Sequence, residues 1–358
     1  MKWLAVLALV GLTACGVNTE VDENSVTSSS SISAGEVVPT LTLVAEVDEP
    51  VDAAARAGDE ALYVVSRVGR VHRIVDGVVV EGAALDISDL TKAEGERGLL
   101  GLAFSPDGSA AFLNFTNNSG NTVIARVDVT TGGVFDRSSL QELLTIEQPY
   151  ANHNGGDIVV DANGALLVAT GDGGSADDPQ RLALDDSSLL GKVLRIDPTT
   201  GEATLIARGL RNPWRIDLYG DDLWIADVGQ GTWEEVSVLR GVSSIEQLVD
   251  FGWSAFEGFE RFNEDQSSAN HQPPLMVYEH GEDGCSISGG AVAEAGSLTG
   301  RYVFADFCSG KVWSIPTDVA DPQKELLFDG IDQPVAIVRA GAELLVLSLQ
   351  GSVWRLVS

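Results

Sequence analysis

The chain has 358 residues, with 53 acidic and 22 basic side chains and a formal net charge of −31 at pH 7. This length suits one large domain or two ordinary ones. Such an acidic balance excludes nucleic acid as a partner, because phosphates need basic residues, and argues against adsorption to anionic membranes. A solvated acidic surface explains most of the excess charge, and adaptation to salt or binding of divalent cations is the alternative.

The first residues, MKWLAVLALVGLTACG, contain one lysine, an apolar stretch too short to span a bilayer, and small residues before Cys15. This pattern predicts an export signal over residues 1–15. The LTAC sequence that ends at Cys15 resembles the lipobox of bacterial lipoproteins, in which the cysteine is lipidated. An ordinary signal peptide is the alternative, but the cysteine lies where cleavage is expected. We therefore predict a lipoprotein of the bacterial cell envelope, periplasmic or on the cell surface, which touches the membrane only through its lipid anchor.

Residues 16–38 are polar, rich in serine and poor in aromatics, so they are predicted to form a flexible tether. A domain on such a tether would face an oxidising compartment. Cys285 and Cys308 are the only cysteines after Cys15. An even pair in an exported protein favours a disulfide over a metal or catalytic site.

From residue 39 onward, one unit recurs six times: a turn with Gly or Asp, an apolar strand, a Gly-rich break, and a strand that ends in an apolar-basic-apolar pattern. The copies begin at Gly58, Gly108, Gly164, Gly220, Gly300 and Gly341. Each is preceded by another short apolar strand. Three or four strands per unit, at a period of about 40–50 residues, are typical of propeller blades. We predict an all-β, six-bladed β-propeller over residues 39–358, with residues 39–47 joining the last blade to close the ring.

In a propeller, the segments that enter the innermost strands converge at the mouth of the central channel. Here they carry polar residues at one register: Glu96-Arg97, Asn152-His153-Asn154, Arg211-Asn212, Ser286, Ser288 and Asp332-Gln333. This mouth is the predicted pocket. Asp172, in the loop after the next strand, can accept a hydrogen bond from one nitrogen of His153 and leave the other as a general base. A histidine that only satisfies the backbone of a turn is an equal alternative from spacing alone.

Five motifs in order, ERGLLGLAFSPDG, NHNGGDIVVDANGALLVATGDGG, LRNPWRIDL, LWIADVGQGTWEEV and FGWSAFEGF, resemble those of the soluble glucose/sorbosone dehydrogenase family. The resemblance runs from about residue 43 to the C-terminus and is greatest for the branch with hedgehog-interacting-protein-like domains. It implies a six-bladed propeller that oxidises a sugar at its anomeric carbon with pyrroloquinoline quinone (PQQ), while a calcium ion polarises the quinone. The electron acceptor is not identifiable, and the expected assembly is a monomer or a dimer.

The resemblance also implies roles for individual residues. His153 resembles the catalytic base and Asp172 the residue that orients it, while Arg211 and Asn212 resemble the pair that contacts the cofactor. The backbone carbonyls of Gly229 and Gln230 match the calcium ligands, and oxygen ligands suit this hard cation.

Three positions depart from the family pattern. Glu96, followed by Arg97, replaces a glutamine, and Asn152 replaces the aspartate before the base. Lys311 stands alone where members have a cluster of basic residues for the three PQQ carboxylates. We count Glu96, Arg97, Asn152 and Lys311 with the expected cofactor contacts, and Arg97 and Arg211 are the residues that could compensate for the missing cluster.

Two other functions are compatible with the sequence. A non-catalytic propeller could bind a protein or a polysaccharide through the same mouth, and a lactonase-like metal hydrolase would need a carboxylate cluster there, for which only Glu96 and Asp332 are available. Trp253 and Phe256 either fill blade interfaces or stack on a sugar ring. His271 and His280 lie near Glu279 and Asp283 in a spacing that fits no strong metal pattern.

Overall fold

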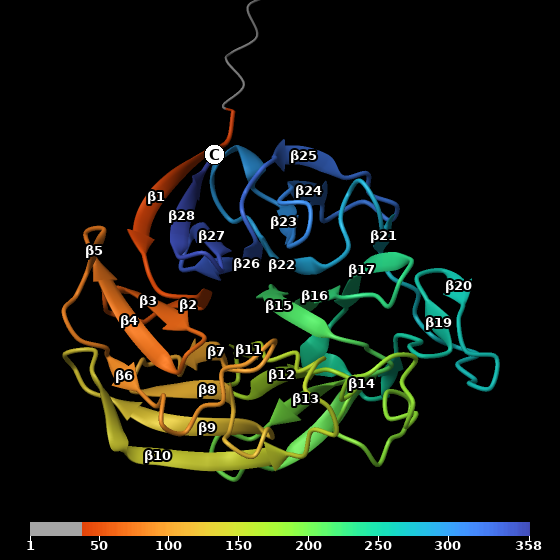
Figure 1. Cartoon of the computed structure of the whole chain (residues 1–358), viewed down its shortest axis with the longest axis horizontal. Coiled ribbons are helices and arrows are strands. Elements are labelled where there is room, and N and C mark those ends of the chain that lie inside the picture. The colour runs from red at the N-terminus through yellow and green to blue at the C-terminus, as the bar shows by residue number, and fades with distance from the viewer. Residues whose placement is uncertain (1–37) are drawn as a thin grey trace, which may run out of the picture. The chain divides into compact units, whose positions relative to one another are not determined.

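The computed structural model describes residues 38–358, which are almost entirely strands and turns arranged in a ring (Figure 1). The predicted signal peptide, the predicted lipidation site Cys15 and nearly all of the predicted tether lie outside the described residues. Within residues 38–358, no helix has the length and apolar character needed to cross a membrane.

Six antiparallel sheets form the blades, which confirms the predicted propeller. The first three blades, each given from its innermost strand outward, consist of β2 (Pro50–Ala55), β3 (Leu62–Ser66), β4 (Arg70–Val75), β5 (Val78–Val79) and β6 (Leu85–Asp86); β7 (Leu99–Phe104), β8 (Ala110–Thr116), β9 (Thr122–Val129) and β10 (Phe135–Ile146); and β11 (Ile158–Val160), β12 (Leu166–Thr170), β13 (Lys192–Ile196), β14 (Ala203–Arg208) and β18 (Val249–Asp250), the last of which pairs in parallel.

The last three blades consist of β15 (Pro213–Tyr219), β16 (Asp222–Asp227), β17 (Trp233–Leu239) and β21 (Met276–Glu279); β22 (Ile287–Val292), β23 (Arg301–Asp306), β24 (Val312–Pro316) and β25 (Glu325–Phe328); and β26 (Pro334–Ala340), β27 (Glu343–Ser348), β28 (Ser352–Val357) and β1 (Thr40–Glu46). Outside the blades lie a small hairpin, β19 (Phe256–Glu257) with β20 (Glu260–Arg261), and two 3-10 turns, Val242–Ser244 and Gly296–Leu298.

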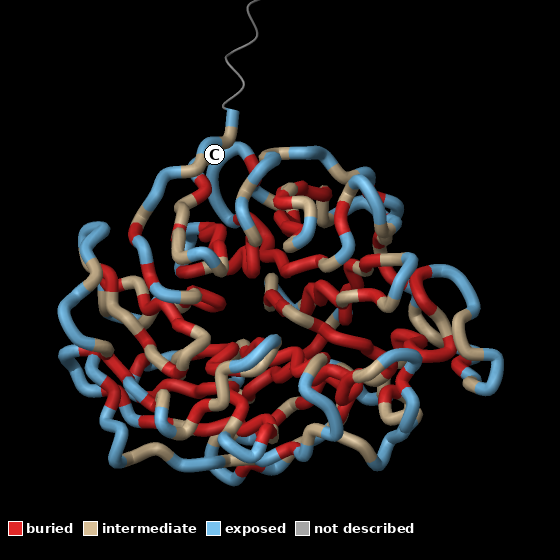
Figure 2. The backbone as a smooth tube through the Cα atoms, in the orientation of Figure 1, coloured by how far each residue is buried: buried red, intermediate tan, exposed pale blue. Residues whose placement is uncertain are grey.

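The ring closes as the sequence predicts, because β1 pairs with β28 from Thr40 opposite Val357 to Glu46 opposite Ser352. The first described strand thus completes the sixth blade. Each innermost strand also contacts the innermost strand of the next blade, all the way around. Buried residues concentrate in the inner and middle strands of the blades, whereas many loops at the periphery are exposed (Figure 2). Closure therefore leaves no unpaired blade at the join.

Aromatic side chains pack between blades. Trp224 of β16 stacks on Tyr302 of β23 with ring centroids 4.9 Å apart, and both residues are fully buried. Tyr63 contacts the rings of Phe104 and Phe135 at 4.9 and 5.9 Å, which joins the first two blades. These contacts bury large aromatic surfaces between neighbouring blades.

Arg215 of β15 crosses the centre of the ring and is 1% exposed. Its Nη2 donates to the carbonyl of Leu100 at 3.0 Å and also to that of Val51. Its Nη1 lies 3.2 Å from Asp157 and 3.8 Å from Asp52. Arg215 belongs to the fourth blade. Its guanidinium therefore links this blade to the inner strands of the first and second blades and to Asp157, just before the inner strand of the third. Val51 lines a cavity at one end of the channel, and the two aspartates line another at the opposite end.

Candidate active site

A cavity of about 410 Å³ opens at one mouth of the channel, within the usual size range of small-molecule sites. The blades contribute its polar lining from six separate segments of the chain: Arg67, Glu96, His153, Arg211, Asn212, Gln230, His280, Cys285, Ser286 and Ser288. Trp214, Phe307, Val335 and Leu349 are among its apolar walls. The segments that lead into the innermost strands of the second to fifth blades therefore converge at this cavity, as predicted. Asp332 and Gln333 do not line it.

His153 is buried at 4% exposure, and its Nδ1 lies 2.7 Å from Oδ1 of Asp172. Because an ionised carboxylate only accepts hydrogen bonds, this contact places the proton on Nδ1 and leaves the lone pair on Nε2. Among residues 38–358, Nε2 has no hydrogen-bond partner. The side chain lines the cavity, so the arrangement is that of a general base oriented by a carboxylate.

The two glycine-rich motifs explain how His153 and Asp172 come together. His153 has a φ of 56°, in the left-handed region that favours glycine. A Cβ at Gly171 would lie 1.9 Å from the carbonyl oxygen of His153, so only glycine allows this approach. The backbone N–H of His153 donates to Glu96 at 2.6 Å, and Asp172 accepts the N–H of Gly174 at 2.9 Å. Local backbone conformation and two carboxylates thus hold the pair in place.

Trp253 has a role that the sequence did not reveal. Its Nε1 donates to Oδ2 of Asp172 at 2.8 Å, and the residue is 4% exposed. The guanidinium of Arg211 lies 5.6 Å from the centre of its ring. Trp253 does not line the cavity, so it supports the His153–Asp172 pair and is not a platform for a sugar ring.

Arg211 and Asn212 both line the cavity. Asp227 accepts their backbone N–H groups at 2.9 and 2.7 Å, and burial raises the pKa of this carboxyl to about 7. Arg211 donates through Nη1 to the carbonyl of Val228 at 2.9 Å.

Asn212 also holds the mouth of the cavity together. Its Nδ2 donates to Oε2 of Glu96 at 3.2 Å, and its Oδ1 accepts the N–H of Gly155 at 3.1 Å. Glu96 therefore joins the loops that carry His153 and Asn212 through hydrogen bonds. This is a structural role for the glutamate that the sequence comparison noted in place of a glutamine.

The loop that carries Gly229 and Gln230 lines the same cavity and is wrapped around a buried carboxylate. Oε1 of Glu257 accepts four successive backbone N–H groups, from residue 230 to residue 233, at 2.8 to 3.3 Å. A Cβ at Gly229 would lie 1.6 Å from the carbonyl oxygen of Trp233. The residues matched to calcium ligands thus occupy a tightly determined turn at the cavity wall.

Three of the expected cofactor contacts do not line the cavity. Arg97 donates to the carbonyl of Tyr150 at 3.1 Å, and Asn152 accepts the N–H of Ser175 at 3.1 Å. Nζ of Lys311 binds the carbonyl of residue 282 at 2.9 Å and Asp283 at 3.2 Å. Each polar side chain is engaged by neighbouring loops, so the basic charge of Arg97 and Lys311 does not reach the cavity wall.

The sequence missed two basic residues of the wall, Arg67 and His280. Arg67 pairs with Glu49 at 2.7 Å and donates to the carbonyl of Gly95 at 2.9 Å. Although the chain is strongly acidic, this wall carries two arginines and one glutamate. Among the described residues, no group of three or more His, Cys, Asp or Glu side chains could hold a metal.

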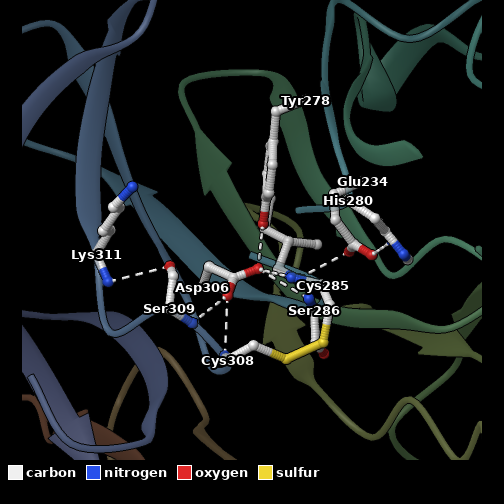
Figure 3. Close-up of a disulfide and its surroundings, with 10 residues drawn as sticks. Glu234, Tyr278, His280, Cys285, Ser286, Asp306, Cys308, Ser309 and Lys311 are labelled. Atoms are coloured by element: carbon white, nitrogen blue, oxygen red, sulfur yellow. Dashed lines mark hydrogen bonds and ion pairs between the residues drawn. A yellow bond between two sulfur atoms is a disulfide. The ribbon is translucent and has the colours of Figure 1, made fainter. Parts of the chain in front are cut away.

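The predicted disulfide is present: Cys285 and Cys308 are joined, and Cys285 lines the cavity (Figure 3). Asp306, which is fully buried, accepts the backbone N–H groups of both cysteines at 3.0 and 2.9 Å. It also accepts the hydroxyl of Tyr278 at 2.8 Å. The bridge and this carboxylate together hold the loop that precedes β22 against the cavity.

Replacing both Cys285 and Cys308 with serine is expected to lower the free energy of unfolding by about 3 kcal/mol, because the bridge closes a loop with a sequence separation of 23. Denaturant titration under non-reducing conditions measures the change. The wild-type protein in excess reductant should unfold at the same midpoint as the double variant. Equal midpoints for the variant and the oxidised wild-type protein would contradict a stabilising role.

Comparison with known proteins supports the family resemblance. A family model for glucose/sorbosone dehydrogenases matches residues 47–346. The HIPL1 and HIPL2 proteins of Arabidopsis thaliana are each 29% identical to this chain, over 225 and 232 residues. These matches cover 49% and 52% of this chain but only 32% of each relative, so the chain spans a minor part of their length.

Two solved structures illustrate the shared fold. The PQQ-bound form of an aldose sugar dehydrogenase from Streptomyces coelicolor is 22% identical with a TM-score of 0.73, and the superposition covers 89% of this chain and 98% of that one. The apo-form of a soluble aldose sugar dehydrogenase from Escherichia coli is 16% identical with a TM-score of 0.72, covering 89% and 99%. The family model spans most of the propeller, and the motifs that form the cavity lie within it. This chain belongs to the glucose/sorbosone dehydrogenase family.

Proposed function

We propose that this protein oxidises an aldose sugar at its anomeric carbon, with PQQ and Ca²⁺ bound in the cavity that His153 lines. The observation that carries the proposal is the His153–Asp172 pair, with its Nδ1–Oδ1 distance of 2.7 Å, in which His153 lines the cavity at the channel mouth. When bound, the quinone would supply the hydride acceptor and calcium would polarise it.

The residues of the cavity fit these groups. Arg211 and Asn212 would hold the cofactor, and the backbone carbonyls of Gly229 and Gln230 would bind calcium, a cation that prefers oxygen ligands. The positive charges of the basic side chains in the wall would attract the negatively charged carboxylates of PQQ. The size of the cavity, about 410 Å³, suits a ligand of this class.

In the proposed reaction, Nε2 of His153 accepts the proton of the C1 hydroxyl, the bound quinone would supply the acceptor for the C1 hydride, and the aldose would be oxidised to a lactone. Asp172 holds the imidazole in the tautomer that can accept this proton and stabilises the charge that develops on it. Trp253 keeps Asp172 in position.

The purified protein should reduce an artificial electron-acceptor dye with aldoses only when PQQ and Ca²⁺ are both supplied. Chelation of Ca²⁺ should remove the activity, and added Ca²⁺ should restore it, because the metal polarises the quinone. Calorimetric titration with PQQ in the presence of Ca²⁺ measures binding independently of turnover. No heat of PQQ binding and no dye reduction with a panel of aldoses would overturn the proposal.

A second candidate is a non-catalytic propeller that binds a protein or a polysaccharide at the same mouth. The engagement of Lys311 by Asp283 favours it, because this leaves the cavity short of the family's basic cluster. Uptake of PQQ in the calorimetric titration would exclude this reading.

We also propose that the protein is exported and anchored by a lipid on Cys15. The disulfide between Cys285 and Cys308 supports an oxidising compartment. A sugar substrate, an unidentified electron acceptor and a monomeric or dimeric state complete the proposal.

A further inference from the structure

A second histidine–carboxylate pair belongs to the same cavity as the His153–Asp172 pair. His280, directly after β21, lines the cavity, and its Nε2 lies 2.5 Å from Oε1 of Glu234. Glu234 is fully buried, and its other oxygen accepts the N–H of Ile287 at 2.8 Å. Figure 3 shows this pair beside the disulfide loop. The position of the imidazole is therefore determined from two blades.

The two pairs differ in which nitrogen they use. His153 contacts its carboxylate through Nδ1, whereas His280 contacts Glu234 through Nε2. Nδ1 of His280 has no hydrogen-bond partner within residues 38–358. When His280 is protonated, Nδ1 carries a proton that can be donated to an anionic ligand group.

The surroundings of His280 favour its charged form. The hydrogen bond to Glu234 raises the pKa of the His280 imidazole, and the charges of Glu234, of Glu257 in β19 and of Asp306 in β23 add to this effect. Burial opposes it. The imidazolium therefore persists to higher pH than that of an unperturbed histidine.

Few other cations are free to serve an anionic ligand here. Arg67 is neutralised by Glu49, and Lys311 binds Asp283 away from the cavity. In the view of Figure 3, Lys311 and His280 lie on opposite sides of Asp306. Among the described residues of the cavity wall, Arg211 forms no salt bridge, and His280 pairs with Glu234 through Nε2 only, which leaves Nδ1 for a ligand.

We propose that His280 is an anion-binding residue of the cavity, which donates from Nδ1 to a carboxylate of the bound ligand. This inference rests on the proposed function, because it assumes that the cavity binds a small ligand with a carboxylate group. That carboxylate belongs either to PQQ or to an acidic sugar such as a uronate. Glu234 is the residue that positions and charges the imidazole.

The first arm of the test compares PQQ affinity, by calorimetry with Ca²⁺ present, for the full-length wild-type protein and His280→Gln. Loss of one charge-assisted hydrogen bond should weaken binding about 10-fold to 100-fold at pH 6. Wild-type affinity should fall as pH rises through the His280 pKa, and the variant should lose this dependence. His72→Gln is the matched control, because His72 lies in β4, outside the cavity lining, and should bind PQQ as the wild-type protein does.

Glu234→Gln provides a second variant that keeps His280 in place. Removing the carboxylate lowers the His280 pKa, so the loss of affinity should move to lower pH while binding at the acid limit is retained. A structural role for Glu234 alone would weaken binding equally at every pH. Thermal unfolding of each variant verifies that it is folded.

The second arm separates the two sources of the carboxylate. If His280→Gln leaves PQQ affinity unchanged but lowers kcat/KM for D-glucuronate about 10-fold or more relative to D-glucose, the carboxylate belongs to the sugar. Unchanged PQQ affinity together with an unchanged ratio would overturn the inference. If the wild-type protein binds no PQQ, the proposed function fails, and NMR titration with D-glucuronate decides this inference separately: shifts of the His280 imidazole signals support it, and their absence overturns it.

Discussion

Replacing His153 with alanine is expected to lower the rate of aldose-dependent dye reduction by about 10²-fold to 10⁴-fold, the usual contribution of a general base. The effect should appear in kcat, because the proposed role of His153 is to accept the C1 hydroxyl proton during the reaction. Stopped-flow or steady-state dye reduction with PQQ and Ca²⁺ at saturation measures it.

Two variants act as controls for this prediction. His72→Ala removes a histidine of an outer strand and should retain full activity. Asp172→Asn removes the carboxylate that accepts from Nδ1, so it should also lower kcat while leaving the fold intact. Near-wild-type turnover by a PQQ-loaded His153→Ala protein would contradict the assignment of His153 as the base.

Replacing Arg215 with methionine is expected to lower the free energy of unfolding by about 3–5 kcal/mol, because removal of one partner leaves buried carboxylates without compensation. Asp52 and Asp157 line the cavity at the end of the channel opposite His153, and both lie close to the Arg215 guanidinium. Denaturant titration at pH 8 measures the change. Arg355→Met is the matched control, since its pair with Glu343 is exposed and should contribute at most about 1 kcal/mol.

The effect of Arg215→Met should depend on pH. Burial raises the pKa of Asp52 from 3.8 to about 7, and Arg215 opposes this rise. A raised carboxyl pKa means that Asp52 contributes stability at pH values below its unfolded pKa, and that this contribution is lost as pH rises through the folded value. Without Arg215 the pKa rises further, so the variant should lose more stability at pH 8 than at pH 5. An equal loss at both pH values would contradict the electrostatic explanation.

Features that depend on neighbours in sequence were predictable. The six repeats, the closing strand at residues 39–47 and the cysteine pair follow from turn chemistry, apolar alternation and cysteine number. The His153–Asp172 contact spans 19 residues within one blade, so a short hairpin brings the two together. These interactions need little knowledge of the rest of the fold.

The charge of the cavity wall was not predictable in the same way. Lys311 and Arg97 stand close to the expected motif positions, yet nearby carbonyls and carboxylates engage their side chains. His280 is 46 residues from Glu234, and Trp253 is 81 residues from Asp172. Long loops of the fourth blade bring these partners together, and no periodicity in the sequence encodes where such a loop ends.

The sequence by itself therefore determined the propeller and the closeness of His153 to Asp172, because strand alternation and glycine-dependent turns are local properties, and its motifs identified the family. Only the tertiary structure decided which charged groups face the ligand: Arg67 and His280 line the wall, whereas Arg97 and Lys311 do not. The physical reason is that a side chain's direction depends on the blade packed against it, and ring closure brings together segments that are far apart in the chain.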